Sequence, residues 1–339
     1  MRVFKTSIPK PIFNHVVNKI STSEYVAIKV GTADADRAAA AVTGSRAADE
    51  ASMVPAAIDQ FSIAGLNGTH PCLVTFPANC SLSDSREASR RFLFHLDVVR
   101  SLCAQLTMTV CFIHSEGYAY EHLYLGILLP QLPSSPNNLS VKQMYAKFGA
   151  PKREPIVSTD EKLTPVSGIL SYAVPPAWLG MASDEVALSE AKLLLSDFDL
   201  ALRPSDKFCL KPQTPLRMPA PEAFFELTTP LSFPSDIWSI GCVIFELLGH
   251  RSLIDESLAS SDEITAQQAQ LQGPMLPEWC NHWEERSKWF DDVGRPLGDE
   301  CIVWSWDRWF EELREEEKAA LLDLLRWMLA WKPKERPSA

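Results

Sequence analysis

The chain has 339 residues, of which 46% are apolar, and a formal net charge of −11. Its length and apolar content predict one large domain or two lobes and exclude a disordered protein. The negative charge argues against a general nucleic-acid or anionic-membrane surface, which needs clustered lysine and arginine, and leaves room only for a small basic patch. The eight cysteines include no C-x-x-C pair, so the sequence indicates neither a zinc site nor a redox motif. We therefore expect a reducing compartment, the cytoplasm or the nucleus.

The first part of the chain is predicted to be mainly β. Residues 1–24 are predicted to be irregular, because prolines interrupt any helix there. Residues 24–30 are β-branched and apolar, and residues 61–76 are typical of two strands joined at a GLNG turn. Between them, the alanine-rich residues 33–54 favour a helix broken at Gly44.

The second part is predicted to be mainly helical. From Arg91 to Ile113, apolar residues recur at steps of three and four, which indicates one long helix. Two further helices are expected in residues 234–250, with Ser235 as a cap, and in residues 310–333. The apolar run inside residues 234–250 is too short for a membrane span and contains Glu246, so no membrane partner is predicted.

Two short strands are expected on either side of a segment with little periodicity. The strands fall in residues 125–132 and 190–202. Residues 131–185 are rich in Pro, Ser and Asn, apart from a short helical pattern near VKQMYAKF, and are predicted to be a spacer insertion.

Five short motifs occur along the chain, and each would mean little alone. They are VAIK ending at Lys29, SDFD at residues 196–199, APE at residues 220–222, DIWS from Asp236, and a late RP at Arg336. A lone lysine on a strand, for example, more often reaches solvent than a ligand. In this order and spacing they resemble the signature of the protein kinases. The stretches NGTHPCLV, LPSS, SEAKLLLSDF, LSFPSDIWSIGC and RPSA resemble, in particular, the fungal SR-protein kinases, the serine/threonine kinases of arginine-serine-rich splicing proteins.

This resemblance, which runs from about residue 25 to the end, implies an α+β, two-lobed protein-kinase fold. Residues 25–78 would form a small, mainly β, truncated N-lobe. Residues 79–339 would form a larger, mainly α C-lobe that carries the spacer at about 131–185. Residues 1–24 contain no glycine, so they lack the glycine-rich loop that covers nucleotide phosphates in the family.

The resemblance also assigns expected roles to single residues. Lys29 would hold the phosphates of ATP, and Asp197 would bind the magnesium ion that bridges them. Glu50 is our candidate for the carboxylate that pairs with Lys29. Two structural bonds are expected as well: one between Glu222 and Arg336, and one from the catalytic-loop backbone to Asp236.

The stretch GYAYEHLYLGILL, residues 117–129, would be the catalytic loop. On the family pattern H-R-D-x-x-x-x-N, the catalytic aspartate position is taken by His122, which we expect to be non-functional. The position of the second magnesium ligand is taken by Ile127, which offers no oxygen. Asp199 replaces the glycine of D-F-G, a residue that gives this turn its backbone freedom.

Three hypotheses follow. The first is a pseudokinase that acts by binding or scaffolding, with protein partners such as Arg-Ser-rich splicing proteins or an active kinase, and with no direct nucleic-acid partner. The alternative is an active ATP-dependent serine/threonine kinase of Arg-Ser-rich proteins, in which the imidazole of His122 accepts the proton. The third is a decaying duplicate or an imperfect gene model that has lost the glycine-rich loop and a final helix. The sequence leaves open whether ATP binds.

Overall fold

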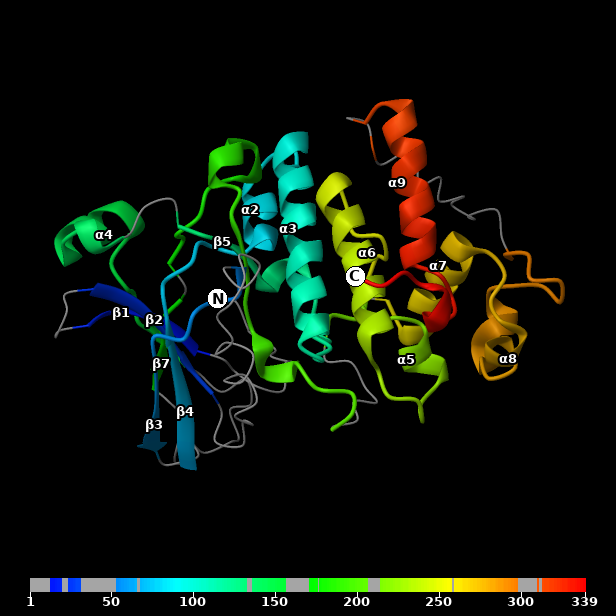
Figure 1. The fold of residues 1–339 in the computed structure, drawn as a ribbon, viewed down its shortest axis with the longest axis horizontal. Coiled ribbons are helices and arrows are strands. Elements are labelled where there is room, and N and C mark those ends of the chain that lie inside the picture. The colour runs from blue at the N-terminus through cyan, green and yellow to red at the C-terminus, as the bar shows by residue number, and fades with distance from the viewer. Residues whose placement is uncertain are drawn as a thin grey trace.

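The computed structural model describes residues 13–19, 24–31, 53–65, 68–132, 136–156, 171–175, 177–206, 214–257, 259–297, 310 and 313–339. The long strands lie on one side of the molecule and the helices α3, α6, α7 and α9 on the other (Figure 1). This arrangement confirms the α+β, two-lobed architecture predicted from the sequence.

The smaller part is an antiparallel sheet in the order β1-β2-β4-β3. Its strands are β1 (Phe13–Lys19), β2 (Glu24–Val30), β3 (Asp59–Gly65) and β4 (Gly68–Thr75). The predicted hairpin is confirmed, with Gly65 opposite Gly68. Residues 1–24 were predicted to be irregular. This prediction is wrong for β1, which pairs along its whole length with β2. The helix predicted at residues 33–54 lies outside the described residues except for its last two positions.

The chain then enters the larger part through α2 (Leu82–Ala88) and α3 (Leu96–Ser115). The sequence did not predict α2, which begins with a capping box between Ser81 and Asp84. It also placed the start of α3 too early. Phe92 has a φ of 57° and an exposed side chain, and its carbonyl accepts a hydrogen bond from Arg86 Nε at 3.0 Å. A residue in this left-handed conformation cannot continue a helix, so α3 begins after it.

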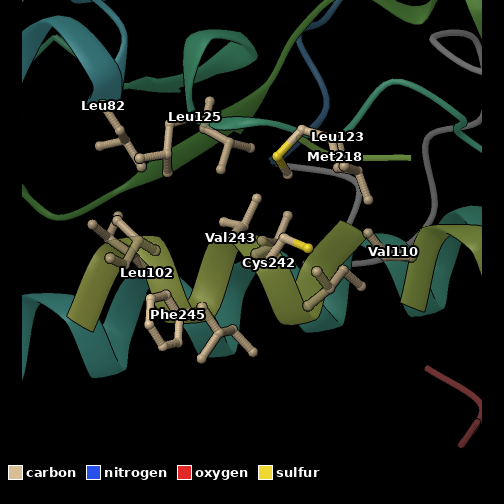
Figure 2. Close-up of a cluster of buried hydrophobic side chains, with 14 of the residues drawn as sticks. Leu82, Leu102, Val110, Leu123, Leu125, Met218, Cys242, Val243 and Phe245 are labelled. Carbon is tan, nitrogen blue, oxygen red and sulfur yellow. The ribbon is translucent and has the colours of Figure 1, made fainter. Parts of the chain in front are cut away.

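The core lies between α3 and α6 (Phe233–Leu248), which pack against each other. Figure 2 shows apolar side chains of the two helices meeting in one cluster with residues from the segments around them. Among the described helices, α3 alone is long and apolar enough to cross a membrane. Its apolar stripe, which includes Leu102, Leu106 and Val110, is buried in this cluster, as in the core helix of a folded domain. Ser232 caps α6, whereas Ser235, the predicted cap, lies inside it.

The two predicted short strands form an antiparallel pair, β5 (Leu128–Pro130) with β8 (Leu193–Leu195). The spacer between them contains α4 (Val141–Phe148), as its helical pattern predicted, and a small ribbon of β6 (Glu154–Pro155) and β7 (Tyr172–Ala173). The larger part ends with α5 (Glu222–Phe225), α7 (Ser261–Gln272), α8 (Pro277–Cys280) and α9 (Glu315–Met328).

Candidate functional site

A lysine from the sheet and two aspartates from the larger part meet between the two parts of the molecule. Lys29 Nζ, on β2, lies 2.6 Å from Asp197 Oδ1 and 3.0 Å from Asp199 Oδ2, both just after β8. We call Lys29, Asp197 and Asp199 the ion triad. All three side chains are at least two-thirds buried, so solvent screens their attraction less than at an open surface.

Asp197 lies in a turn after β8, and the loop that contains Tyr120 stabilises this turn. Asp197 has φ 66° and ψ 62°, a left-handed conformation that is uncommon for residues other than glycine. The hydroxyl of Tyr120, which is fully buried, donates to the carbonyl oxygens of Ser196 and Asp197. This hydrogen bond fixes the backbone on both sides of the strained residue and directs its carboxylate toward Lys29.

The loop that contains Tyr120 is itself anchored to α6. The carboxylate of Asp236 accepts the backbone N–H of Tyr120 at 2.7 Å and that of Glu121 at 2.8 Å. His114 Nε2 lies 2.8 Å from the same carboxylate. The predicted role of Asp236 as acceptor for the loop backbone is therefore confirmed.

His122 points toward the ion triad. Its Nε2 lies 3.9 Å from Asp197 Oδ2, and its Nδ1 is buried with no hydrogen-bond partner among the described residues. Burial lowers the pKa of the imidazole more than the charge of Asp197 raises it, so the ring is neutral at pH 7.

The ring of Tyr124 packs edge-on against the imidazole of His122 and lies directly over Gly126. A Cβ atom at position 126 would fall 2.4 Å from a ring carbon of Tyr124. Glycine is thus required at position 126 as long as Tyr124 keeps this orientation.

Ile127 contributes its backbone and not its side chain. The side chain is buried in the core cluster, and the carbonyl oxygen accepts hydrogen bonds from Ser196 N at 3.1 Å and Ser196 Oγ at 2.8 Å. The oxygen is therefore already used, and the side chain has none to offer. Within the part of the chain that the structure describes, Asp197 and Asp199 are the carboxylates next to Lys29, and a magnesium ion would compete with the lysine for them.

Sequence reasoning missed two features of this region. The first is the contact of Asp199 with Lys29; the second acid in SDFD was the available signal. The other is Glu121, a buried carboxyl on a residue with φ 61°, whose Oε1 accepts a hydrogen bond from Ser235 Oγ at 2.7 Å. Burial, together with the nearby Asp236, raises the pKa of Glu121 well above its ordinary value. Glu50, the predicted partner of Lys29, lies outside the described residues.

A buried ion pair joins the segment that follows the ion triad to the C-terminal residues. Arg336 Nη1 and Nη2 each lie 2.6 Å from a different carboxylate oxygen of Glu222. Arg336 also donates to the carbonyls of Ala330 and Pro234. The predicted pair is thus confirmed, and its two parallel hydrogen bonds are the strong form of such a contact.

A groove of about 650 Å³ lies beside α5 and the start of α7. Four carboxylate residues and several aromatic ones line it, with no lysine or arginine among the described lining residues. Trp283 Nε1 donates to Asp262 at 2.7 Å, and Glu285 pairs with Lys288 at the rim. We call it the acidic groove; its main lining residues are Phe224, Phe225, Glu226, Asp262, Trp283, Glu284 and Glu285.

Comparisons with known proteins agree with this geometry. Residues 185–339 match the protein kinase domain family. The crystal structure of the kinase domain PF14_0431 superposes with a TM-score of 0.58 at 16% identity, covering 96% of this chain and 88% of its own. The chain has the protein-kinase fold.

Curated relatives with this kinase fold are distant. Serine/threonine protein kinases from two strains of Aspergillus fumigatus, CBS 144.89 / FGSC A1163 / CEA10 and ATCC MYA-4609 / CBS 101355 / FGSC A1100 / Af293, are each 24% identical over 293 residues. Each alignment covers 85% of this chain and 67% of the relative. In this fold, the ion triad joins β2 of the small lobe to the segment after β8 in the larger lobe, and the acidic groove lies in the larger lobe.

Proposed function

We propose that this chain is a pseudokinase: a kinase-fold protein with little or no phosphate transfer, which acts by binding other proteins. The observation that carries the proposal is the ion triad. Asp197 and Asp199 already take up two of the three N–H donors of Lys29, so a phosphate would have to compete with both carboxylates, and Asp199 would repel it. ATP and magnesium are therefore weak ligands of this site at best.

The neighbouring positions support the same proposal. Phosphate transfer depends on charge neutralisation by metal ions and on a base that orients the attacking hydroxyl. Here His122 and Ile127 stand at the positions of the base and the second metal ligand, and neither supplies an oxygen. The bonds that serve the scaffold, from Asp236 to the loop and from Arg336 to Glu222, are intact.

The acidic groove supports a basic partner. Arginine side chains prefer surfaces that combine carboxylates with aromatic faces, because the guanidinium group pairs with the former and stacks on the latter. The net charge of −11 favours the approach of a basic segment as well. We infer that the partners are Arg-Ser-rich proteins of the SR type, bound in the cytoplasm or the nucleus, and that an active kinase could then act on them.

A phosphate-transfer assay with magnesium, radiolabelled ATP and an Arg-Ser-repeat peptide tests the proposal. The unmodified chain should transfer no phosphate. A variant with His122→Asp, Ile127→Asn and Asp199→Gly should gain measurable transfer, because these changes restore the base, the metal ligand and the turn. Transfer by the unmodified chain that is abolished by Asp197→Ala would show that the proposal is wrong.

One observation favours the alternative, an active serine/threonine kinase. The neutral imidazole of His122 lies beside the ion triad, 3.9 Å from Asp197, and a neutral imidazole accepts protons near pH 7. In that case His122→Gln should abolish transfer, and the rate should fall as the pH is lowered through the depressed pKa of the imidazole. A rate that His122→Gln leaves unchanged would exclude His122 as the base.

A further inference from the structure

The spacer differs in charge from the rest of the molecule. Two described parts of the spacer, residues 136–156 and 171–175, contain four basic side chains and one acidic one, whereas the whole chain is strongly acidic. The described end of the spacer, residues 177–185, adds two acids, Asp184 and Glu185, so the positive charge is local to these two parts. Every residue from 149 to 156 is exposed. We call these parts the basic spacer surface; its basic residues are Lys142, Lys147, Lys152 and Arg153.

This surface also has exposed apolar groups. On α4, Val141, Met144, Tyr145 and Phe148 recur at the spacing of one helix face, yet none of them is buried. Val141 and Tyr145 are 45% and 47% exposed. A capping box of Ser140 and Gln143 stabilises the helix itself. The helix is therefore well formed, and the described part of the chain covers its apolar face only in part, at Met144 and Phe148.

The side chain of Arg153 stacks on an exposed aromatic ring. Its guanidinium group lies 4.4 Å from the centre of the Tyr172 ring, and both residues are exposed. Stacking of this kind restricts the arginine to few conformations, so that less conformational entropy is lost when it binds a carboxylate. Tyrosine and arginine are also the residue types that contribute most to binding at protein interfaces.

The chain contains a surface with the complementary chemistry. The acidic groove combines carboxylates with the partly exposed rings of Phe224 and Phe225. Glu226 and Glu284 have no ion-pair partner among the described residues. In Figure 1, α4 and the elements α5, α7 and α8 lie at opposite ends of the molecule. The two surfaces cannot meet within one molecule.

We propose that the basic spacer surface of one molecule docks into the acidic groove of a second copy of the chain. The proposal rests on the preference of the groove for basic segments, stated above as part of the proposed function. In this contact Arg153 enters between the carboxylates of Glu226 and Glu284, and Tyr145 packs near the rings of the groove.

The two surfaces differ, so the contact is heterologous and leaves one free spacer and one free groove at the ends of each assembly. Short open chains of molecules are therefore expected, and they dissociate at high salt because exposed charges drive the contact. Self-association would also occupy the groove and compete with a basic partner protein.

Sedimentation velocity of the full chain tests this inference. The unmodified chain should self-associate at low salt, and both Lys152→Glu/Arg153→Glu and Glu226→Lys/Glu284→Lys should weaken the association about tenfold or more. Arg90→Glu/Arg326→Glu, which reverses two exposed charges outside both surfaces, should leave it unchanged. A chain that stays monomeric at all concentrations, or association that neither double variant reduces, overturns the inference.

Mixing the two double variants separates loss of contact from damage to the fold. The spacer variant keeps an intact groove and the groove variant keeps an intact spacer, so a one-to-one mixture should form heterodimers although each variant alone is monomeric. An Arg-Ser-repeat peptide titrated onto the monomeric spacer variant tests the groove independently. Peptide binding without heterodimers overturns the self-association and leaves the proposed function standing, whereas absence of both overturns the two together. Binding of the basic spacer surface to phosphatidylserine vesicles, with no self-association, would also overturn the inference.

Discussion

Lys29 Nζ lies 3.0 Å from a carboxylate oxygen of Asp199, a residue that occupies the glycine position of the D-F-G pattern. The negative charge that neutralises the lysine thus comes from the chain itself. In a working kinase the corresponding lysine pairs with a glutamate of the small-lobe helix and with the nucleotide phosphates.

Asp199→Asn should therefore strengthen nucleotide binding. The change removes a negative charge next to the lysine but keeps the size of the side chain, so the repulsion of a phosphate falls by about 1 kcal/mol, a severalfold effect on affinity. Titration of a fluorescent ATP analogue, with and without magnesium, measures it. Asp323→Asn, at an exposed acid on α9, is the matched control and should have no effect. Equal affinities for all three proteins would contradict the importance of Asp199.

Arg336→Ala should lower the free energy of unfolding by about 3–5 kcal/mol, because it leaves the buried carboxylate of Glu222 without its partner. The side chain of Arg336 is fully buried and that of Glu222 is 7% exposed. Urea unfolding provides the measurement. Arg326→Ala, which removes the exposed pair with Asp323, should cost only about 0.3–0.5 kcal/mol. Similar costs at the two positions would argue against a structural role of the buried pair.

Glu121→Gln should make the protein more stable at neutral pH and reduce the dependence of its stability on pH. Burial raises the pKa of Glu121 above its ordinary value of 4.5. A carboxyl whose pKa is higher in the folded than in the unfolded protein contributes fully to stability below its unfolded-state pKa. This contribution is lost as the pH rises through its folded-state pKa. Glutamine is neutral in both the folded and the unfolded protein, so its contribution to the free energy of unfolding does not change with pH. The melting temperature from pH 5 to pH 9 should therefore fall more steeply for the unmodified chain than for the variant.

A second glutamate near the same loop provides the control for this pH prediction. Glu116→Gln changes an exposed glutamate close to the same loop and should leave the slope unchanged. A slope that Glu121→Gln does not alter would mean that Glu121 is ionised in the folded protein.

Gly126→Ala should destabilise the protein by about 1–3 kcal/mol, because the added methyl group meets the ring of Tyr124. The same substitution in a Tyr124→Ala background should cost much less, since the obstructing ring is gone. A double-mutant cycle by chemical unfolding measures the coupling between the two positions. Additive effects would show that the ring does not lie over Gly126 in solution.

The sequence predicts those parts of the structure that local pattern or motif spacing specifies. The strands β5 and β8, the helix α4 and the pair of Glu222 with Arg336 are of this kind. The early start predicted for α3 fails because the apolar spacing continues through Phe92, while its backbone is left-handed. Strand β1 was missed because the prolines at positions 9 and 11 indicated an irregular segment, whereas the strand begins after them, at Phe13, and pairs with β2.

In the candidate site, the positions of single residues were easier to predict than their interactions. Lys29 and Asp197 were named from motifs, but the contact of Lys29 with Asp199 joins residues 170 positions apart, which no local pattern encodes. The raised pKa of Glu121 likewise results from burial against α6. Such burial is a property of the folded molecule and has no counterpart in the sequence around residue 121.

Asp236 holds the loop through the backbone N–H groups of Tyr120 and Glu121 and makes no demand on their side chains. The anchor on α6 therefore constrains the backbone path of the loop and not the side chain at the neighbouring position 122, whereas Tyr120 and Glu121 have side-chain hydrogen bonds of their own. Under the proposed function, a substitution at position 122 that removes the base would leave the loop in the shape that its anchor on α6 gives it. Under the same proposal, restoring the base by substitution would require no rebuilding of the loop, because its backbone is already anchored.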